Sequence, residues 1–431
     1  MAEEPAAGPD EPTAASASAP GIASLAAAPR ALRFAALRVP TFRWYWTLSA
    51  LSGMGDSMEN VLRDWLVWSL THSVFWLGMM VFAHWVPFTF FSLYGGVLAD
   101  RYDNRKVQIV SQLLLFGAAA GVAAATLVGF VTVWWIVALL LVHGFAGAIG
   151  GPAQQTLIHS IVGRDRLVSA VSLNSAIRQV AQVAGPVIAG VILIVFGAGW
   201  GFLVNALTFL PLLAMLAIMR VRPLGERSRQ AIPTALREGL GFIRARPRLV
   251  ALIGIEMLPT IFLGGAFTSL LPAFATDVLH GGAIHYALLL AASGAGALIA
   301  VLYLAYARTP RSVGLVILGA AAAQVTAILL FALSTAYLLS AALMVIVGLC
   351  AVITQTYNNT TLQLSAPDAL RGRVMGAYSF GAQGVRVVNG PLLGTLAALV
   401  GAPVAVAGSA AVVLASLLAI LARVRAIRGR G

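Results

Sequence analysis

Three ionisable side chains lie close together in one apolar stretch near the start of the chain. Asp56, Glu59 and Arg63 are spaced three and four residues apart, which places them on one face of an α-helix. A charge at mid-bilayer costs about 2.5–3.5 kcal/mol, so each needs a partner or a function. Glu59 and Arg63 can neutralise each other across one turn, which leaves Asp56 without an obvious local cation. We predict that Asp56 couples to protons; the alternative is a hydrogen bond to Asn60 or another helix, without titration.

A second set of charges lies in later apolar stretches. Glu256 follows Arg248 by eight residues, which places it about 12 Å into a helix that carries no neighbouring cation. Arg178 and Arg386 also lie within apolar stretches. Each arginine could pair with an acid across the interface between the two halves of the chain, and Asp56 and Glu256 are both candidate partners. Glu256 joins Asp56 and Glu59 as a candidate proton-coupling residue. The sequence leaves these pairings open.

Two further polar residues have simpler interpretations. Asp64 adjoins Trp65 and Trp68, and tryptophans form aromatic belts at membrane interfaces. We therefore predict that Asp64 lies near the outer membrane interface, where solvent reaches its charge. His143 precedes Gly147 by four residues. We expect His143 to be a packed, hydrogen-bonded histidine rather than a proton relay.

Apolar helices must hold these charges, and the composition supplies them. Of the 431 residues 60% are hydrophobic and 10% charged, against about 45–50% and about 25% in soluble domains. Apolar stretches long enough to cross a bilayer, which takes ~20 helical residues, recur twelve times. They lie near residues 43–69, 75–98, 106–128, 132–157, 167–196, 200–219, 249–274, 284–306, 312–333, 335–362, 373–399 and 402–422. The predicted fold is an all-α polytopic membrane protein with twelve transmembrane helices.

The basic residues lie on one side of this arrangement. All but Arg63, Arg178 and Arg386 of the 28 Lys and Arg residues fall in alternate connections, in the middle stretch or near the ends. By the positive-inside rule that side is the cytoplasm. We therefore expect a multi-pass plasma (inner) membrane protein with both termini cytoplasmic, and the net charge of +13 does not indicate nucleic-acid binding.

A weak internal repeat divides the helices into two pseudo-symmetric halves of six. An offset of 205 residues superposes Arg166 on Arg371 and the Gly-Pro pair at 185–186 on that at 390–391. Parallel repeats of this kind build transporters with a substrate site between the halves. The predicted units are a disordered cytoplasmic tail (1–40), an N-terminal half (41–220), a linker with an amphipathic helix (221–248), a C-terminal half (249–422) and a basic tail (423–431).

The connection after the second stretch carries the most specific motif. It reads GVLADRYDNRK and resembles the signature loop of the major facilitator superfamily, G-x-L-a-D-R-x-G-R-K. The matching residues are Gly96, Leu98, Asp100, Arg101, Arg105 and Lys106. Asp103 stands where the superfamily usually has glycine, and Asn104 is one residue more than the spacing allows, so the turn must be made differently. The resemblance implies a cytoplasmic gating loop that latches helix ends; a mere cluster of positive-inside charges is the alternative.

The fifth stretch contains GPVIAG, at Gly185, Pro186 and Gly190. It is similar to the antiporter motif of drug exporters, with Ala189 replacing a glycine. Gly390 and Pro391 repeat the Gly-Pro pair in the second half. Such pairs kink a helix and can act as hinges.

The start of the first span together with these elements resembles the bacterial branch that contains enterobactin exporters and macrolide-efflux proteins, over about residues 34 to 422. The resemblance implies a secondary-active exporter of amphiphilic small molecules, of drug or siderophore class, that works by alternating access and proton antiport. A uniporter or lipid transporter of the same fold, and a non-transporting receptor or scaffold, are the alternatives.

The sequence predicts no enzyme, cofactor or metal site. It has no Walker A loop, no Gly-x-Ser-x-Gly elbow and no His-Glu-x-x-His pair. Its single cysteine, Cys350, cannot form an intrachain disulfide or a thiolate cage. The expected partners are a small amphiphilic substrate, protons and the lipid bilayer, and we expect a functional monomer.

Overall fold

The computed structural model describes residues 34–163, 166–220, 232–306, 310, 312–365 and 368–428, and all of its regular elements in this part of the chain are helices. The tail residues 1–33, most of the linker (221–231) and residues 429–431 lie outside the described residues. The end of the expected N-terminal tail is a 3-10 turn, η1 (Ala35–Arg38), in which the amide of Ala36 donates a hydrogen bond to Ser169 Oγ (3.2 Å).

The first six spans are long helices close to the predicted ranges. They are α3 (Pro40–Thr71), α4 (Val74–Arg101), α5 (Asn104–Val128), α6 (Val133–Val162), α7 (Leu167–Val195) and α8 (Ala198–Ile218). Pro87, Pro152, Pro186 and Pro211 lie inside these helices without ending them. The Gly-Pro pair at 185–186 lies inside α7, which corresponds to the predicted fifth span.

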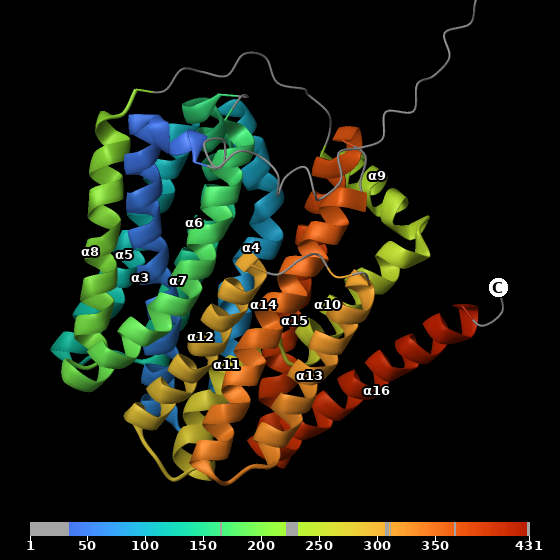
Figure 1. The fold of residues 1–431 in the computed structure, drawn as a ribbon. Coiled ribbons are helices and arrows are strands. Elements are labelled where there is room, and N and C mark those ends of the chain that lie inside the picture. The colour runs from blue at the N-terminus through green and yellow to red at the C-terminus, as the bar shows by residue number, and fades with distance from the viewer. Residues whose placement is uncertain are drawn as a thin grey trace, which may run out of the picture.

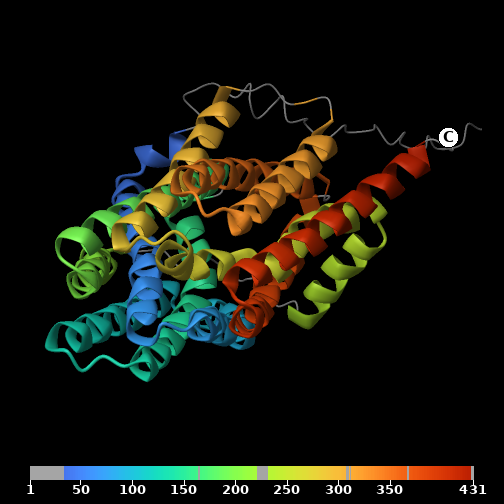
Figure 2. The same ribbon diagram turned by 90° about the horizontal axis from the view of Figure 1, so that it is seen from below.

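The second set follows a linker helix, α9 (Ile232–Arg244), within the predicted amphipathic segment. The spans are α10 (Pro247–Phe262) with α11 (Gly264–Ala273) and the π-turn η2 (Phe274–Val278), then α12 (Ala283–Tyr306), α13 (Val313–Leu333), α14 (Tyr337–Ser365), α15 (Asp368–Val400) and α16 (Ala402–Arg428). Figures 1 and 2 both show the C-terminal part of α16 extending outward from the bundle.

Length and apolarity allow most of these helices to cross a membrane. Within the described residues ten helical stretches qualify, and Gly384–Val400 of α15 adds a shorter apolar one. α3 is as long as the others but carries Asp56, Glu59, Arg63 and Asp64. With α3 and α15 the arrangement is a twelve-helix bundle of two halves, as the sequence predicted.

The two halves meet at one end of the bundle and separate at the other. We call the end where α3 begins and α8 ends the linker face, and the opposite end, which carries the turn at His72, the hairpin face. Figure 1 shows the halves lying together toward the hairpin face and apart toward the linker face. The largest buried apolar cluster contains residues of both halves, whereas the linker ends have separate clusters, one around Phe42 and Leu216 and one around Leu249 and Val374.

Small residues make the contact between the halves close. Gly78 on α4 lies against the backbone of Gly390 and Gly394 on α15, so a side chain at this position would strike backbone atoms. Gly190 on α7 lies against the side chain of Ala287 on α12. Such residues allow helices to approach closely in lipid, where apolar burial gives little drive for association.

The seventh span is broken between α10 and α11. Leu263 leaves helical geometry, and Gly264 adopts φ +32°, which glycine tolerates better than other residues. Asn389, a fully buried residue of α15, accepts a hydrogen bond from Ala266 N (2.9 Å) and donates one to Ile261 O (3.2 Å). The amide therefore satisfies backbone groups on both sides of the break.

The signature loop is ordered by its unusual residues. Asp103 caps α5, because its carboxylate accepts a hydrogen bond from Arg105 N (2.9 Å). Arg105 then donates to the last carbonyls of α8, from Nε to Leu216 O (2.6 Å) and from Nη2 to Ala217 O (2.7 Å). A cation at a helix C-terminus is favourable, so this side chain ties α5 to the end of α8.

Candidate functional site

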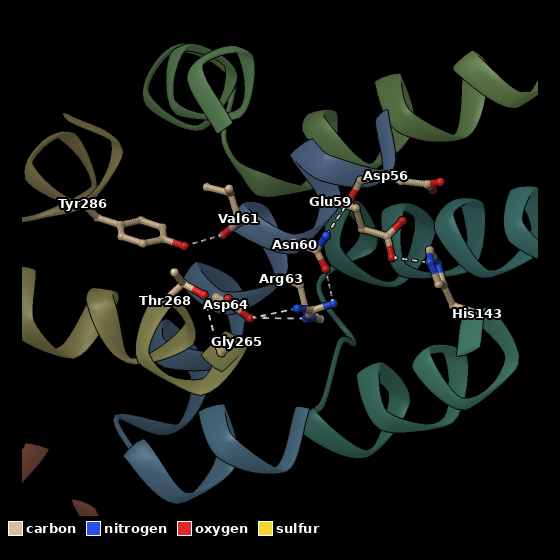
Figure 3. A network of polar contacts seen from close by, with 10 residues as sticks. All are labelled: Asp56, Glu59, Asn60, Val61, Arg63, Asp64, His143, Gly265, Thr268 and Tyr286. Atoms are coloured by element: carbon tan, nitrogen blue, oxygen red, sulfur yellow. Dashed lines mark hydrogen bonds and ion pairs between the residues drawn. The ribbon is translucent and has the colours of Figure 1, made fainter. Parts of the chain in front are cut away.

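The polar face of α3 forms a connected network in the N-terminal half. Arg63, which is 6% exposed, donates from Nε (3.3 Å) and Nη2 (3.1 Å) to Oδ1 of Asp64, and from Nη1 to Oδ1 of Asn60 (2.9 Å). Figure 3 shows these bonds. Neutralisation of Glu59 by Arg63 was expected, but the ion pair of Arg63 goes to Asp64. The adjacent carboxylate is buried and takes two of the guanidinium hydrogen bonds.

Glu59 finds its partners on other helices. Its Oε2 accepts a hydrogen bond from Asn205 Nδ2 on α8 (2.5 Å), and its Oε1 lies 3.4 Å from Nδ1 of His143 on α6. Glu59 is 5% exposed and Asn205 fully buried. The contact with His143 becomes an ion pair when the imidazole is protonated. His143 therefore belongs to the charged site, and not only to the packing of α6 as the sequence suggested.

Asp56 completes a group of three ionisable side chains. Figure 3 shows Asp56, Glu59 and His143 pointing toward one another, and one donor atom of each lies within 4.8 Å of the other two. Oδ1 of Asp56 is buried and has no hydrogen-bond partner among the described residues, whereas Asn60 donates to the backbone oxygen of Asp56 (3.0 Å). These three side chains could also bind a metal ion. Glu59, however, already accepts a hydrogen bond from Asn205 and faces His143, an arrangement suited to sharing a proton.

Asp64 lies at the junction between the halves rather than at the solvated interface that its neighbouring tryptophans indicated. It is 5% exposed and accepts a hydrogen bond from Ser269 on α11. Nearby, Tyr286 on α12 donates to Val61 O (3.3 Å) and stacks on Trp65 with ring centroids 5.8 Å apart. These contacts link α3 to the C-terminal half on the hairpin side of the charged group.

A second polar group surrounds Glu256 in the C-terminal half. Asn358 on α14, which is fully buried, donates from Nδ2 to Oε2 of Glu256. Tyr378 on α15 is hydrogen-bonded to the same carboxylate, and Arg386 is close enough to interact with it electrostatically. Arg386 thus interacts with Glu256 of its own half. The sequence had left this pairing open.

Aromatic rings connect the two polar groups. His84 on α4 lies 5.2 Å from His143 and 5.0 Å from Trp85, measured between ring centroids. Cζ of Arg386 lies 4.8 Å from the centroid of the Trp85 ring. A cation over an indole face is attracted by the ring quadrupole, and here the contact joins α15 of one half to α4 of the other.

The remaining predicted site residues lie elsewhere. Arg178 occupies an exposed position on α7. Gly185 packs on α3 against Ser57, while Gly190 packs on α12 of the other half. Gly96, Arg101 and Lys106 lie with Arg105 around the connection of α4 to α5 at the linker face, and the side chain of Asp100 lies outside the described part of the chain.

Sequence reasoning missed Asn205 as a partner of Glu59 and His84 as part of the site. An asparagine within the apolar stretch 200–219 is the signal that was available for Asn205. His84 stands beside Trp85 in the second span, and nothing in its spacing distinguishes it from a packed residue.

Comparison with known proteins identifies the family. The family of transmembrane secretion effectors matches residues 31–429, nearly all of the chain. The chain belongs to this family. The family lies within the major facilitator superfamily, as the motifs indicated, and the chain is thus a multi-pass membrane transporter.

Individual relatives and structures agree with this assignment. The enterobactin exporter EntS of Citrobacter koseri is 28% identical over 369 residues, which cover 84% of this chain and 86% of that protein. EntS of Escherichia coli O139:H28 is 27% identical over the same length and the same shares of each chain.

Solved structures share the fold at low identity. The nucleoside transporter NupG gives a TM-score of 0.68 at 15% identity and covers 89% of this chain and 98% of its own. A bacterial homolog of the human lysosomal transporter Spinster, inward-facing and unoccupied, gives 0.65 at 14% identity and covers 91% and 95%.

Proposed function

We propose that this protein exports amphiphilic small molecules from the cytoplasm in exchange for protons, by alternating access. The observation that carries the proposal is the buried group of Asp56, Glu59 and His143. Efflux is the transport that the family description and the EntS relatives support. The proton as coupling ion and the residues that bind it are our inference.

The charge balance of α3 favours proton binding. Three carboxylates, those of Asp56, Glu59 and Asp64, face one guanidinium and the imidazole of His143. Even with His143 protonated, one carboxylate lacks a counter-charge, and an uncompensated buried charge is costly. His84 on α4 and the amide of Asn205 on α8 are the other polar groups that face the site. A further proton shared by Asp56 and Glu59 would neutralise the group.

Proton binding would bias the arrangement of the halves through α3. Arg63 connects the proton-binding group to Asp64, which contacts α11 of the other half. When Asp56 and Glu59 lose their proton, they compete with Asp64 for Arg63. Weakening of the Arg63–Asp64 pair would loosen the hairpin-face contact and favour opening on that side.

The orientation and the substrate class complete the proposal. We propose that the linker face lies in the cytoplasm, because the basic connections lie on that side. The halves, which separate toward the linker face, would then be arranged to take up substrate from the cytoplasm. The relatives are named for a siderophore, enterobactin, and we propose substrates of siderophore or drug class. The monomer contains both halves and is the proposed functional unit.

Transport in proteoliposomes with an imposed pH gradient tests the proposal. We expect substrate movement against its gradient when protons flow the opposite way, and loss of this drive in an Asp56→Asn variant. Asp277→Asn is the matched control, because Asp277 is exposed beside the hairpin face. Transport that ignores the pH gradient in the wild-type protein would indicate a uniporter and refute the antiport proposal.

A further inference from the structure

Arg386 stands out as a half-buried cation at the point where the two halves part. It lies one turn from Gly390, where α15 touches Gly78 of α4 at the hairpin side. Trp85, its aromatic partner, lies two turns from Gly78 on α4 toward the linker face. The pair thus lies on the linker-face side of the close contact between Gly78 and Gly390, toward the end where the halves separate (Figure 1).

The guanidinium of Arg386 is only partly compensated. Within the described residues no carboxylate lies within 4.0 Å of it, and the ion pairs there are those of Arg63 and His143. Glu256 interacts with it at longer range, while the Glu256 carboxylate already accepts hydrogen bonds from Asn358 and Tyr378. Among the described residues no hydrogen-bond acceptor engages the planar donors of Arg386, and a planar anion could take two of them at once.

On the N-terminal half, aromatic side chains pack against Trp85, the ring that contacts this cation. Trp85 packs edge-on against Phe88 (5.5 Å between ring centroids) and against His84 (5.0 Å). Both Trp85 and Phe88 are half-buried, so their rings retain accessible surface. An aromatic ring of a ligand would find stacking partners beside the guanidinium.

We propose that Arg386 and Trp85 form a substrate subsite that takes the aromatic, anionic end of the exported molecule, a carboxylate or phenolate carried on a ring. The anion replaces the indole face as the partner of Arg386, and the ring packs on Trp85 and Phe88. Because Arg386 belongs to one half and Trp85 to the other, a bound molecule contacts both halves. Arg386 would repel a cationic amphiphile from the same position. This inference rests on the proposed function and specifies its substrate.

Binding of two probes with the same ring and opposite charge tests the subsite. Isothermal titration calorimetry with the full-length protein in detergent would compare 1-naphthoate with 1-naphthylmethylammonium. We expect naphthoate to bind more tightly, and Arg386→Gln to weaken it about tenfold or more without weakening the ammonium probe. Arg386→Lys, which keeps the charge and loses the planar fork, should weaken naphthoate to a smaller extent. Trp85→Leu should weaken naphthoate as well.

The chain offers a matched control. Arg246 also lies over an aromatic ring, that of Phe242 at 3.5 Å, but on an exposed position at the linker face. Arg246→Gln should leave both affinities unchanged. Should Arg386→Gln fail to elute as a folded monomer, Arg386→Lys carries the test.

Three results would overturn the subsite: no binding of naphthoate to the wild-type protein, an unchanged affinity in both Arg386 variants, or tighter binding of the ammonium probe. Equilibrium binding requires neither transport nor a proton gradient. A failure here would therefore leave proton-driven export standing, whereas loss of gradient-driven transport with intact naphthoate binding would refute the proposed function alone.

Discussion

The two halves of the bundle stabilise their polar interiors by different chemistry. In the N-terminal half, carboxylates on α3 are matched by a guanidinium and an imidazole, with the amide of Asn205 as a further partner of Glu59. In the C-terminal half, two buried asparagines carry this role: Asn358 donates to Glu256, and Asn389 bridges the break between α10 and α11. Amides hold one charge state, whereas acids and imidazoles exchange protons.

The difference shows that the repeat preserves helices and not chemistry. The offset of 205 residues that superposes the Gly-Pro pairs places Glu256 on Leu51 and Arg178 on Gln383. Each half can therefore specialise without disturbing the packing that the two share. The proposed proton exchange thus falls in the N-terminal half, whereas the cation of the proposed anion subsite, Arg386, belongs to the C-terminal half.

The largest expected effect breaks the charge-based interior. Asp64→Leu leaves the Arg63 guanidinium buried with Asn60 as its remaining hydrogen-bond partner among the described residues, and should lower the free energy of unfolding by about 3–5 kcal/mol. Denaturant unfolding of the purified protein in detergent measures this. The double variant Arg63→Met with Asp64→Leu removes both charges and should recover most of the loss. If Asp64→Leu were as stable as the wild type, the Arg63–Asp64 ion pair would not contribute to stability.

A smaller loss is expected from the amide-based interior. Asn389→Ala leaves Ala266 N–H and Ile261 C=O without partners, at a cost of about 1–3 kcal/mol. The loss should be the same between about pH 5 and pH 8, because no ionisable group is removed. Ser416→Ala is the control, since Ser416 is half-buried and its hydroxyl donates to Val412 O within the same helix, α16. A loss that varies with pH would contradict the distinction between the halves.

Two conservative variants compare the carboxylates of the halves directly. Glu59→Gln should reduce transport driven by a pH gradient about tenfold, equivalent to about 1.4 kcal/mol, and flatten its pH profile. Glu256→Gln should leave the response to the gradient within about twofold, because this acid is held by Asn358 and Tyr378. The reverse pattern in proteoliposomes would move proton coupling to the C-terminal half.

The smallest effect is expected at the linker face, away from both interiors. Arg105→Gln removes two hydrogen bonds to the end of α8 and should cost about 0.3–1 kcal/mol. The pH response of transport should not change. Lys106→Gln, at the next position, which is exposed, provides the control in the same unfolding measurement. A cost above that of Asn389→Ala would mean that the signature loop contributes more than a helix-end contact.

The sequence predicted the helices well because their boundary signals are local. Apolar length, charged ends and turn residues delimit each span, so the predicted range 167–196 corresponds to α7 at Leu167–Val195. The break in the seventh span was not predicted. It requires Asn389, a residue more than a hundred positions away, to satisfy the backbone that the break exposes.

The candidate site was predicted in part. The three- and four-residue spacing placed Asp56, Glu59 and Arg63 on one helical face, and that face does point into the bundle. The prediction that Arg63 pairs with Glu59 was wrong, because Arg63 pairs with Asp64. Helical spacing shows which side chains can meet, and not which of the possible contacts forms. The aromatic neighbours of Asp64 gave no sign that Ser269 of the other half would cover it.

What the sequence by itself determined is the number of spans, their extent, the division into two sets and the helix that carries buried charge. Each follows from the free-energy cost of placing polar groups in lipid, to which every residue of a span contributes separately. Only the tertiary structure decided which groups meet: Asn205 and His143 reach Glu59, and Arg386 reaches Trp85, from distant helices. In lipid the apolar surface of a helix fits many neighbours equally well, so the close approach at glycines and the pairing of the few polar groups select the final arrangement.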